Sequence, residues 1–160
     1  MFPYLGQAIT GLETVDAALL IGSYIRKDQP LLAHRLRKAA RRGARISALN
    51  SIDYEFNFDL QQTLVVNPLA IAANLAAIVK AMAEISGKPV PAAIADSVGK
   101  AKVSETHKSI ASDLASANNA TILIGLHAMA NPRFAAIRAL ANALAQMSGA
   151  KPGYLPAGAN

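Results

Sequence analysis

The 160-residue chain contains no cysteine. It therefore forms no disulfide, offers no thiolate nucleophile, and holds no zinc ribbon or iron–sulfur cluster through its own side chains. Although 52% of the residues are hydrophobic, many are alanine, and no uninterrupted run reaches the roughly 18 apolar residues of a membrane-spanning helix. The first four residues, Met1–Tyr4, have neither the basic nor the apolar region of a signal peptide. We expect a soluble, cytosolic protein without direct membrane insertion.

Several motifs of ligand binding and catalysis are also missing. Gly22 does not begin a G-x-G-x-x-G turn, and no phosphate-binding G-x-x-x-x-G-K-[ST] occurs. Ser23 lacks the G-x-S-x-G context of a hydrolase nucleophile. His34, His107 and His127 are scattered, and none has a carboxylate or a second histidine at metal-ligand spacing. We therefore predict no catalytic residues, no metal site and no cofactor held within this segment.

The clearest structural signal comes from two short apolar runs and the segment between them. Ala17–Ile21 ends at Gly22, and Arg45–Leu49 is a second short run, as expected of strands that are buried on both faces. Between them, Pro30–Arg42 has apolar residues at helical spacing on one side and basic residues on the other. These three segments predict a right-handed βαβ unit whose helix lies on a sheet.

The rest of the chain continues this alternation. Thr10–Glu13 fits a capping box and predicts a short helix or turn before the first strand. In the helix expected at Pro68–Ser86, Ile85 should face inward. The further elements are strands at Thr63–Val66, Ala120–Ile124 and Lys151–Leu155, helices at Pro68–Ser86, at Ala92–Val98, from Ser104 and from Asn131 to Gly149, and loops at Asn50–Gln62 and Pro156–Asn160. The pattern predicts an α/β fold, with a three-layer, doubly wound, mostly parallel sheet and helices on both faces, in one Rossmann-like domain over residues 1–160.

In such a sheet, ligands bind outside the carboxyl ends of the strands. Two interpretations of these ends stay open: they bind a nucleotide-like ligand through backbone amides and through Ser23 or Asn50, or their glycines only permit tight turns. The residues favour the second interpretation. The candidate positions at three strand ends are Gly22, Ser23, Asn50, Ser51, Gly125 and His127.

The formal net charge of +6 comes mainly from one helix and its flanks. Half of the sixteen lysines and arginines lie between residues 26 and 45: Arg26, Lys27, Arg35, Arg37, Lys38, Arg41, Arg42 and Arg45. A nucleic-acid interface would need aromatic or amide partners for the bases, and the helix has only Tyr24 near it in sequence. We therefore expect a solvated face or a contact with an acidic partner, and no nucleic acid.

Two segments resemble a known family. The sequence LLIGSYIRKDQPLLAHRLRKAARRGARISALN resembles the first nucleotide-type βαβ unit of the molybdopterin oxidoreductase superfamily, and is most similar to the large iron–sulfur subunit of bacterial NADH–quinone oxidoreductase, respiratory complex I. The segment ANPRFAAIRALANALAQMSGAKPGYLPAGAN is similar to a later helix of that large subunit and to the Gly-Tyr-Leu-Pro segment after it. The resemblance is weaker from Asp53 to Asn119.

The resemblance implies a piece of a longer subunit, with Met1 as an added start. Its cysteine-bound iron–sulfur clusters would lie elsewhere in the subunit, on the cytoplasmic side of the inner membrane, and its partners would be other peripheral-arm subunits. Molybdenum enzymes of the superfamily typically have Asn after the first Gly-Ser, and Asp-Pro-Arg after the second strand. This chain has Tyr24-Ile25 and Asn50-Ser51-Ile52 there. These departures argue against a bound molybdopterin and fit the complex I branch, in which the domain is a scaffold without molybdenum.

Overall fold

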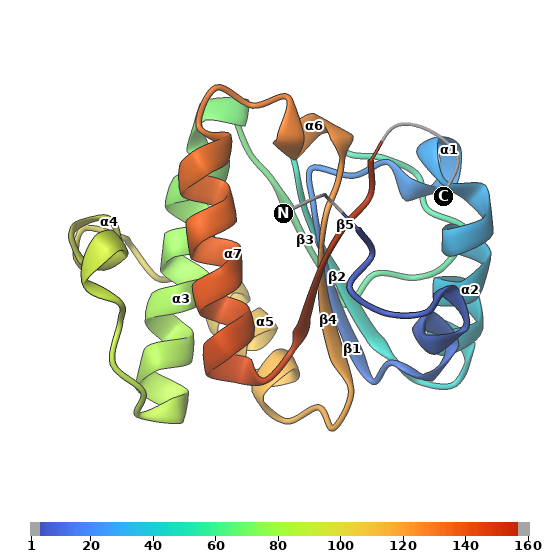
Figure 1. Cartoon of the computed structure of the whole chain (residues 1–160), viewed down its shortest axis with the longest axis horizontal. Coiled ribbons are helices and arrows are strands. Elements are labelled where there is room, and N and C mark those ends of the chain that lie inside the picture. Colours follow the sequence, from blue (N-terminus) through green and yellow to red (C-terminus); the bar gives the residue numbers. More distant parts are fainter. Residues whose placement is uncertain (1–3, 157–160) are drawn as a thin grey trace.

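A computed structural model describes residues 4–156, so the features expected at the start of the chain and in the tail after residue 156 lie outside the described residues. Within this part, five strands form one sheet in which every pairing is parallel. The order is β3-β2-β1-β4-β5, which places the change of winding direction between β1 and β4 (Figure 1). The strands are β1 (Ala17–Ile21), β2 (Arg45–Asn50), β3 (Gln62–Val65), β4 (Ala120–Ile124) and β5 (Lys151–Tyr154).

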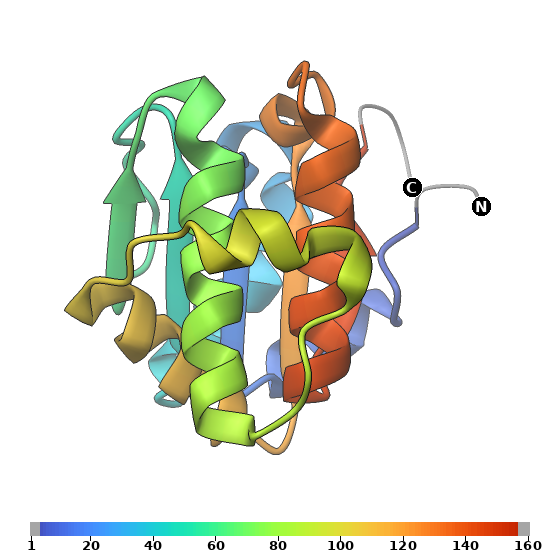
Figure 2. The same ribbon diagram turned by 90° about the vertical axis from the view of Figure 1, so that its left-hand side faces the viewer.

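Helices cover both faces of the sheet and complete the predicted three-layer α/β fold. One face carries α3 (Ile71–Ser86), α5 (Glu105–Ala115) and α7 (Phe134–Ser148). The other carries α2 (Pro30–Arg41), the single turn α1 (Ile25–Asp28) and the 3-10 helix η1 (Ile9–Thr14). In Figure 2, α3 and α7 lie side by side, and the segment with η3 (Ala92–Ile94) and α4 (Ala95–Gly99) crosses their outer side.

The central strand β1 divides the core into two parts. Leu19 and Ile21 point into the larger part, beneath α3, α5 and α7. Ala18 and Leu20 point into the smaller part, beneath α2 and η1. Because successive side chains of a strand alternate between faces, a strand that is covered on both sides reads as a continuous apolar run. This explains why the run Ala17–Ile21 predicted the strand at its observed bounds.

Helix α2 lies on the sheet through the stripe that its spacing predicted. Leu32, Ala33, Leu36 and Ala39 are buried beneath it. Full burial of a leucine such as Leu36 contributes roughly 1.5–3 kcal/mol to stability. The predicted βαβ unit is therefore confirmed.

The later elements also lie close to their predicted positions. The strand β4 has the predicted bounds, and β3 begins one residue earlier than expected. Asn67 caps the helical turn η2 (Pro68–Ala70), which leads into α3, through a hydrogen bond from the N–H of Leu69. Gly87 and Gly149 directly follow α3 and α7, as predicted for helix ends.

Three local predictions are wrong. The predicted short helix before the first strand is present as η1, but its capping box is not: Thr10 lies inside η1, and the Glu13 carboxylate binds Arg35 and Lys38 on α2. Ile85, which was expected to face inward, is 49% exposed in the last turn of α3. Two single-turn helices, α1 and α6 (Leu126–Met129), follow β1 and β4, where the sequence indicated only turns at the strand ends. Their few residues give too little periodicity to distinguish a helical turn from a loop.

The helical stretch 68–86 is the one described helix whose length and composition would also suit a membrane span. Its alanines raise its average hydropathy without forming an uninterrupted run of large apolar residues. Half of the stretch is buried inside the protein, where α3 packs against α5 and α7. The packing of α3 against its neighbouring helices thus accounts for its apolar composition.

Candidate functional site

The carboxyl ends of β1 and β4 meet at the centre of the sheet, near α1 and α6 (Figure 1). Gly22 ends β1 with a φ of +58°, and a Cβ there would lie 2.4 Å from the backbone nitrogen of Ala128. The Gly22 carbonyl accepts hydrogen bonds from the N–H groups of His127 (3.0 Å) and Ala128 (3.4 Å). A Cβ on Gly125 would lie 2.5 Å from the Gly22 oxygen. The two turns are therefore in direct backbone contact.

The end of β2 is joined to the same place by an asparagine side chain. Asn50 Oδ1 accepts a hydrogen bond from the N–H of Ser23 (2.8 Å), and Asn50 Nδ2 donates to the carbonyl of Ser23 (3.2 Å). Both residues are only 1% exposed. Ser51 follows, half-buried, at the start of the connection to β3. The amide of Asn50 thus binds the chain's own backbone at the position where the sequence placed a ligand contact.

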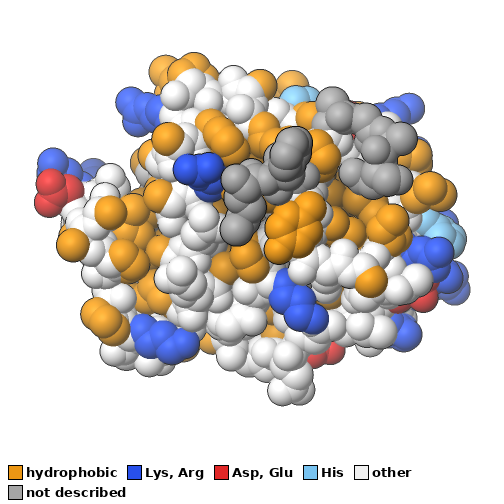
Figure 3. All heavy atoms as spheres, viewed as in Figure 1, with side chains coloured by type: hydrophobic (Ala, Val, Ile, Leu, Met, Phe, Trp, Pro, Cys, Tyr) orange, Lys and Arg blue, Asp and Glu red, His pale blue; other side chains and the backbone are white. Residues whose placement is uncertain are grey.

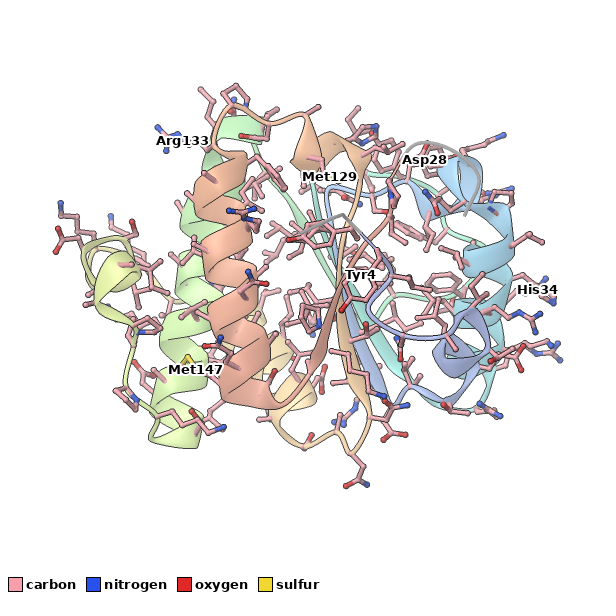
Figure 4. The ribbon with its side chains drawn as sticks, in the orientation of Figure 1. Tyr4, Asp28, His34, Met129, Arg133 and Met147 are labelled. Atoms are coloured by element: carbon pink, nitrogen blue, oxygen red, sulfur yellow. The ribbon has the colours of Figure 1, made fainter. Side chains whose placement is uncertain are left out.

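Three aromatic rings meet just beyond these strand ends. Tyr24 and Tyr54 are stacked, with ring centroids 4.3 Å apart and an interplanar angle of 7°. The Tyr54 hydroxyl shares a hydrogen bond of 3.0 Å with Nδ1 of His127, and the two rings are tilted with centroids 5.6 Å apart. We call this set the aromatic cluster. In Figure 4, Asp28 on α1 and Met129 on α6 mark the same end of the molecule.

The environment of the aromatic cluster raises the pKa of Tyr54. The main cause is partial burial of the hydroxyl, followed by the nearby negative charge of Asp28 and by Tyr24. Each of these disfavours the phenolate. The hydroxyl is therefore a hydrogen-bonding group that holds Tyr54 on His127, and it is poorly suited to act as a base.

The other two histidines lie away from the strand ends. His34 is exposed on the outer side of α2 and points outward (Figure 4). His107 is buried; its Nδ1 accepts from the N–H of Ser104 (3.0 Å), and its Nε2 lies 3.0 Å from Asn74 Oδ1. Burial lowers the pKa of His107, so the neutral ring caps α5. Within residues 4–156, no group of three or more His, Asp or Glu could hold a metal ion.

Comparison with protein families shows the family of the chain. Residues 3–160 match the family described as molybdopterin oxidoreductase. The chain belongs to this family. No curated protein matches it. The family is an oxidoreductase family, so the domain described above has an oxidoreductase context.

The family's name implies a pterin cofactor, and the strand ends of this molybdopterin oxidoreductase domain do not suit one. Ser23 and Asn50 bond to each other, and the turns at Gly22 and Gly125 touch through their backbones. Tyr54 could not be assigned to this place from the sequence, because it lies in a long connection without periodicity. The sequence signal for an aromatic contact at this edge is limited to Tyr24 and His127, which directly follow the ends of β1 and β4.

The basic helix of the domain has two unlike flanks. On one flank, Arg35 and Lys38 both bind the carboxylate of Glu13, and these two cations hold the pKa of Glu13 below its usual range. On the other flank, Arg37 and Arg41 are exposed and have no ion-pair partner among the described residues. Figure 3 shows the basic side chains as blue spheres along the right-hand edge, over α2.

Arg37 and Arg41 line a groove of about 540 Å³ between α2 and the connection from β2 to β3. The other lining residues are Ala40, Phe56, Asn57, Phe58 and Asp59. We call it the α2 groove. Although only Tyr24 is near the basic helix in sequence, the connection from β2 to β3 folds back and places two phenylalanines and an amide beside it. Arg26 and Arg45, at the ends of the basic segment, pair with Glu55 and Asp113.

Proposed function

We propose that this molybdopterin oxidoreductase domain is a non-catalytic scaffold of the large iron–sulfur subunit of NADH–quinone oxidoreductase. In this role it would stabilise the peripheral arm, while electrons pass from NADH to quinone through iron–sulfur clusters outside this segment. The observation that carries the proposal is the pairing of Asn50 with the backbone of Ser23. This pairing uses the polar groups that a nucleotide-like cofactor would need at the end of β1.

Two further features support a scaffold. The aromatic cluster lies at the strand ends, and its hydroxyl and imidazole are bonded to each other. The hydroxyl–imidazole pair at this edge is Tyr54 with His127, and the raised pKa of Tyr54 disfavours the phenolate, which is the nucleophilic form of the side chain. The resemblance of the two segments around Gly22 and Pro132 to the large iron–sulfur subunit then favours the complex I branch within the family.

The proposal includes the surroundings of the domain. Its partners would be the rest of its own chain and other peripheral-arm subunits, at the cytoplasmic side of the inner membrane. Because the pterin would have to displace the Asn50 side chain, we derive no chemical step through it. A pterin or guanine-nucleotide site of a molybdenum enzyme is the alternative against which the proposal is tested.

The test is to isolate the native assembly through an affinity tag on this chain and to identify its metals and activity. We expect iron, an NADH-oxidising partner subunit, and quinone reduction that persists when cells grow on tungstate instead of molybdate. An assembly that contains molybdenum and loses activity on tungstate would contradict the proposal. As a matched control, a known molybdenum enzyme of the same cells must lose activity under these conditions.

A second measurement addresses the strand ends directly. Calorimetry with guanosine diphosphate is expected to show no heat of binding to the purified protein. Binding that disappears in Asn50→Ala would instead assign a nucleotide site to this edge and would favour the alternative.

A further inference from the structure

His107 lies in a hydrogen-bond network that joins the start of α5 to α3. The residue is only 6% exposed. Its Nε2 atom lies 3.0 Å from Asn74 Oδ1 on α3. Its Nδ1 atom accepts from the N–H of Ser104 (3.0 Å) and lies 2.8 Å from the Ser104 hydroxyl oxygen. The network therefore uses both ring nitrogens, and it ties the residue that precedes α5 to the neighbouring helix.

The position of the ring proton follows from the neighbouring bonds. Asn74 donates through Nδ2 to the carbonyl of Ala70 (3.0 Å), so its Oδ1 atom faces His107. A side-chain amide oxygen can only accept a hydrogen bond, which places the ring proton of His107 on Nε2. The Nδ1 atom is then the acceptor for the N–H of Ser104. A second proton could bind only at Nδ1, where this N–H already points.

Three features of the site oppose this second proton. It would set two N–H groups, on Nδ1 of His107 and on the backbone of Ser104, against each other. It would place a positive charge in the first turn of an 11-residue helix, where the helix dipole favours a negative charge. It would also bury the charge among neutral partners, because both Asn74 and Ser104 are uncharged.

The charged residues around the site do not offset this cost. In the first turn of α5, Glu105 pairs with Lys108, and burial is the cause that lowers the pKa of His107. The strands β1 and β3, on which α5 also packs, carry no titratable side chain. The other charged residues of the preceding segment and of the helices packed on α5 are Lys80, Glu84, Lys100, Lys102 and Arg138. Within residues 4–156, no carboxylate forms an ion pair with the ring.

We propose that His107 is an acid-sensitive latch between α5 and α3. The neutral ring holds Ser104 at the start of α5, and the protonated ring releases it, so that the stretch 100–107 opens while the sheet stays folded. This stretch is suited to local opening, because none of the residues 100–106 is buried. Burial holds the folded pKa of His107 below its ordinary value of 6.5. The stability that the neutral ring contributes is therefore complete above pH 6.5 and is lost as the pH falls from there through the folded pKa.

The test is NMR with hydrogen exchange on the purified protein from about pH 7.5 to about pH 5, the range in which histidine changes its charge. We expect the ring nitrogen shifts of His107 to show the Nε2–H form at neutral pH. As the ring becomes protonated, the amide of Ser104 should lose protection several-fold after correction for its intrinsic exchange rate, while the amides of α7 keep theirs. A neutral ring with its proton on Nδ1, a ring that stays neutral throughout, or protonation without a change at Ser104 would overturn the proposal.

A substitution of His107 separates the latch from the helix cap. In His107→Gln, the glutamine stands three residues after Ser104 and completes a capping box that accepts the same N–H but does not titrate. We expect this variant to keep Ser104 protected down to about pH 5. The matched control is His34→Gln, which removes an exposed histidine from α2 and should lose protection at Ser104 as the wild type does. An equal loss in His107→Gln would contradict the latch. If this variant does not fold, the wild-type titration decides.

Discussion

The carboxyl edge of the sheet and the α2 groove show opposite uses of polar groups. At the edge, where an open parallel sheet binds ligands, Asn50 and Ser23 bond to each other, and Tyr54 stacks on Tyr24, the residue after Ser23. In the α2 groove, Arg37 and Arg41 have no ion-pair partner among the described residues, and Asn57 keeps a buried acceptor unpaired. The polar groups at the edge where the fold places ligands are thus paired, while the groove between a helix and an irregular connection keeps two cations that are unpaired within the described part of the chain.

The closure of the edge depends first on the absence of a side chain at Gly22. We expect Gly22→Ala to destabilise the protein by about 3 kcal/mol or more, because a positive φ is combined with a clash against Ala128. Gly43→Ala is the matched control: Gly43 also has a positive φ, of +92°, but has nothing within 4 Å of a Cβ. Its expected cost is about 1 kcal/mol. Equal losses in denaturant unfolding would show that the two turns do not pack tightly.

The side chain of Asn50 is the next most important group at this edge. Asn50→Ala should cost about 2 kcal/mol, since it leaves the buried N–H and carbonyl of Ser23 without their partners. The exposed Asn118→Ala, whose side chain makes no such bond, should remain within about 0.5 kcal/mol of wild type. Thermal unfolding of both variants measures the difference. A loss at Asn50 no larger than at Asn118 would mean that the edge is open to solvent.

The aromatic cluster should be visible in an alkaline titration. Because burial raises the pKa of Tyr54 above 10.0 in the folded protein, the unfolded chain loses this proton first as the pH rises. The contribution of Tyr54 to stability is therefore complete below pH 10.0 and is lost as the pH rises from there through the folded pKa. Ultraviolet absorbance should show the hydroxyl of Tyr54 ionising later in the folded protein than in the unfolded chain.

Tyr54→Phe should remove this late step, whereas Tyr4→Phe, at an exposed position, should leave it in place. If the late step survives in Tyr54→Phe, the raised pKa belongs to another tyrosine.

The smallest effect on stability is expected in the α2 groove. Arg37→Gln with Arg41→Gln should change the free energy of unfolding by less than about 0.5 kcal/mol, with a slight gain from removing like charges one turn apart. Arg35→Gln should melt lower than this double variant, because it loses its ion pair with Glu13. The comparison by thermal unfolding separates the two flanks of α2. A large loss in the double variant would show that the groove arginines serve the fold.

Much of the fold could be predicted from local sequence, because the buried strands are short apolar runs that end next to glycine or polar residues. Ala17–Ile21 and Ala120–Ile124 gave the central strands at their observed bounds, and the spacing of Leu32 and Leu36 gave the buried side of α2. The single turns α1 and α6 could not be predicted, since four residues carry no helical period. Of the strand-end candidates, Gly22, Ser23, Asn50, Gly125 and His127 do come together. Their role as remnants of a ligand site stays a prediction.

Local sequence alone decides which segments form the parallel sheet, because burial on both faces requires apolar residues at every position of a strand. The roles of the polar and charged residues emerge only from the folded arrangement. The pairing of Asn50 with Ser23 spans 27 residues, and the contact between Tyr54 and His127 spans 73. The path of the connection 51–61 depends on where Phe56 and Phe58 pack beneath α2. Such contacts join residues that are distant in the chain, so they cannot be predicted from local sequence patterns.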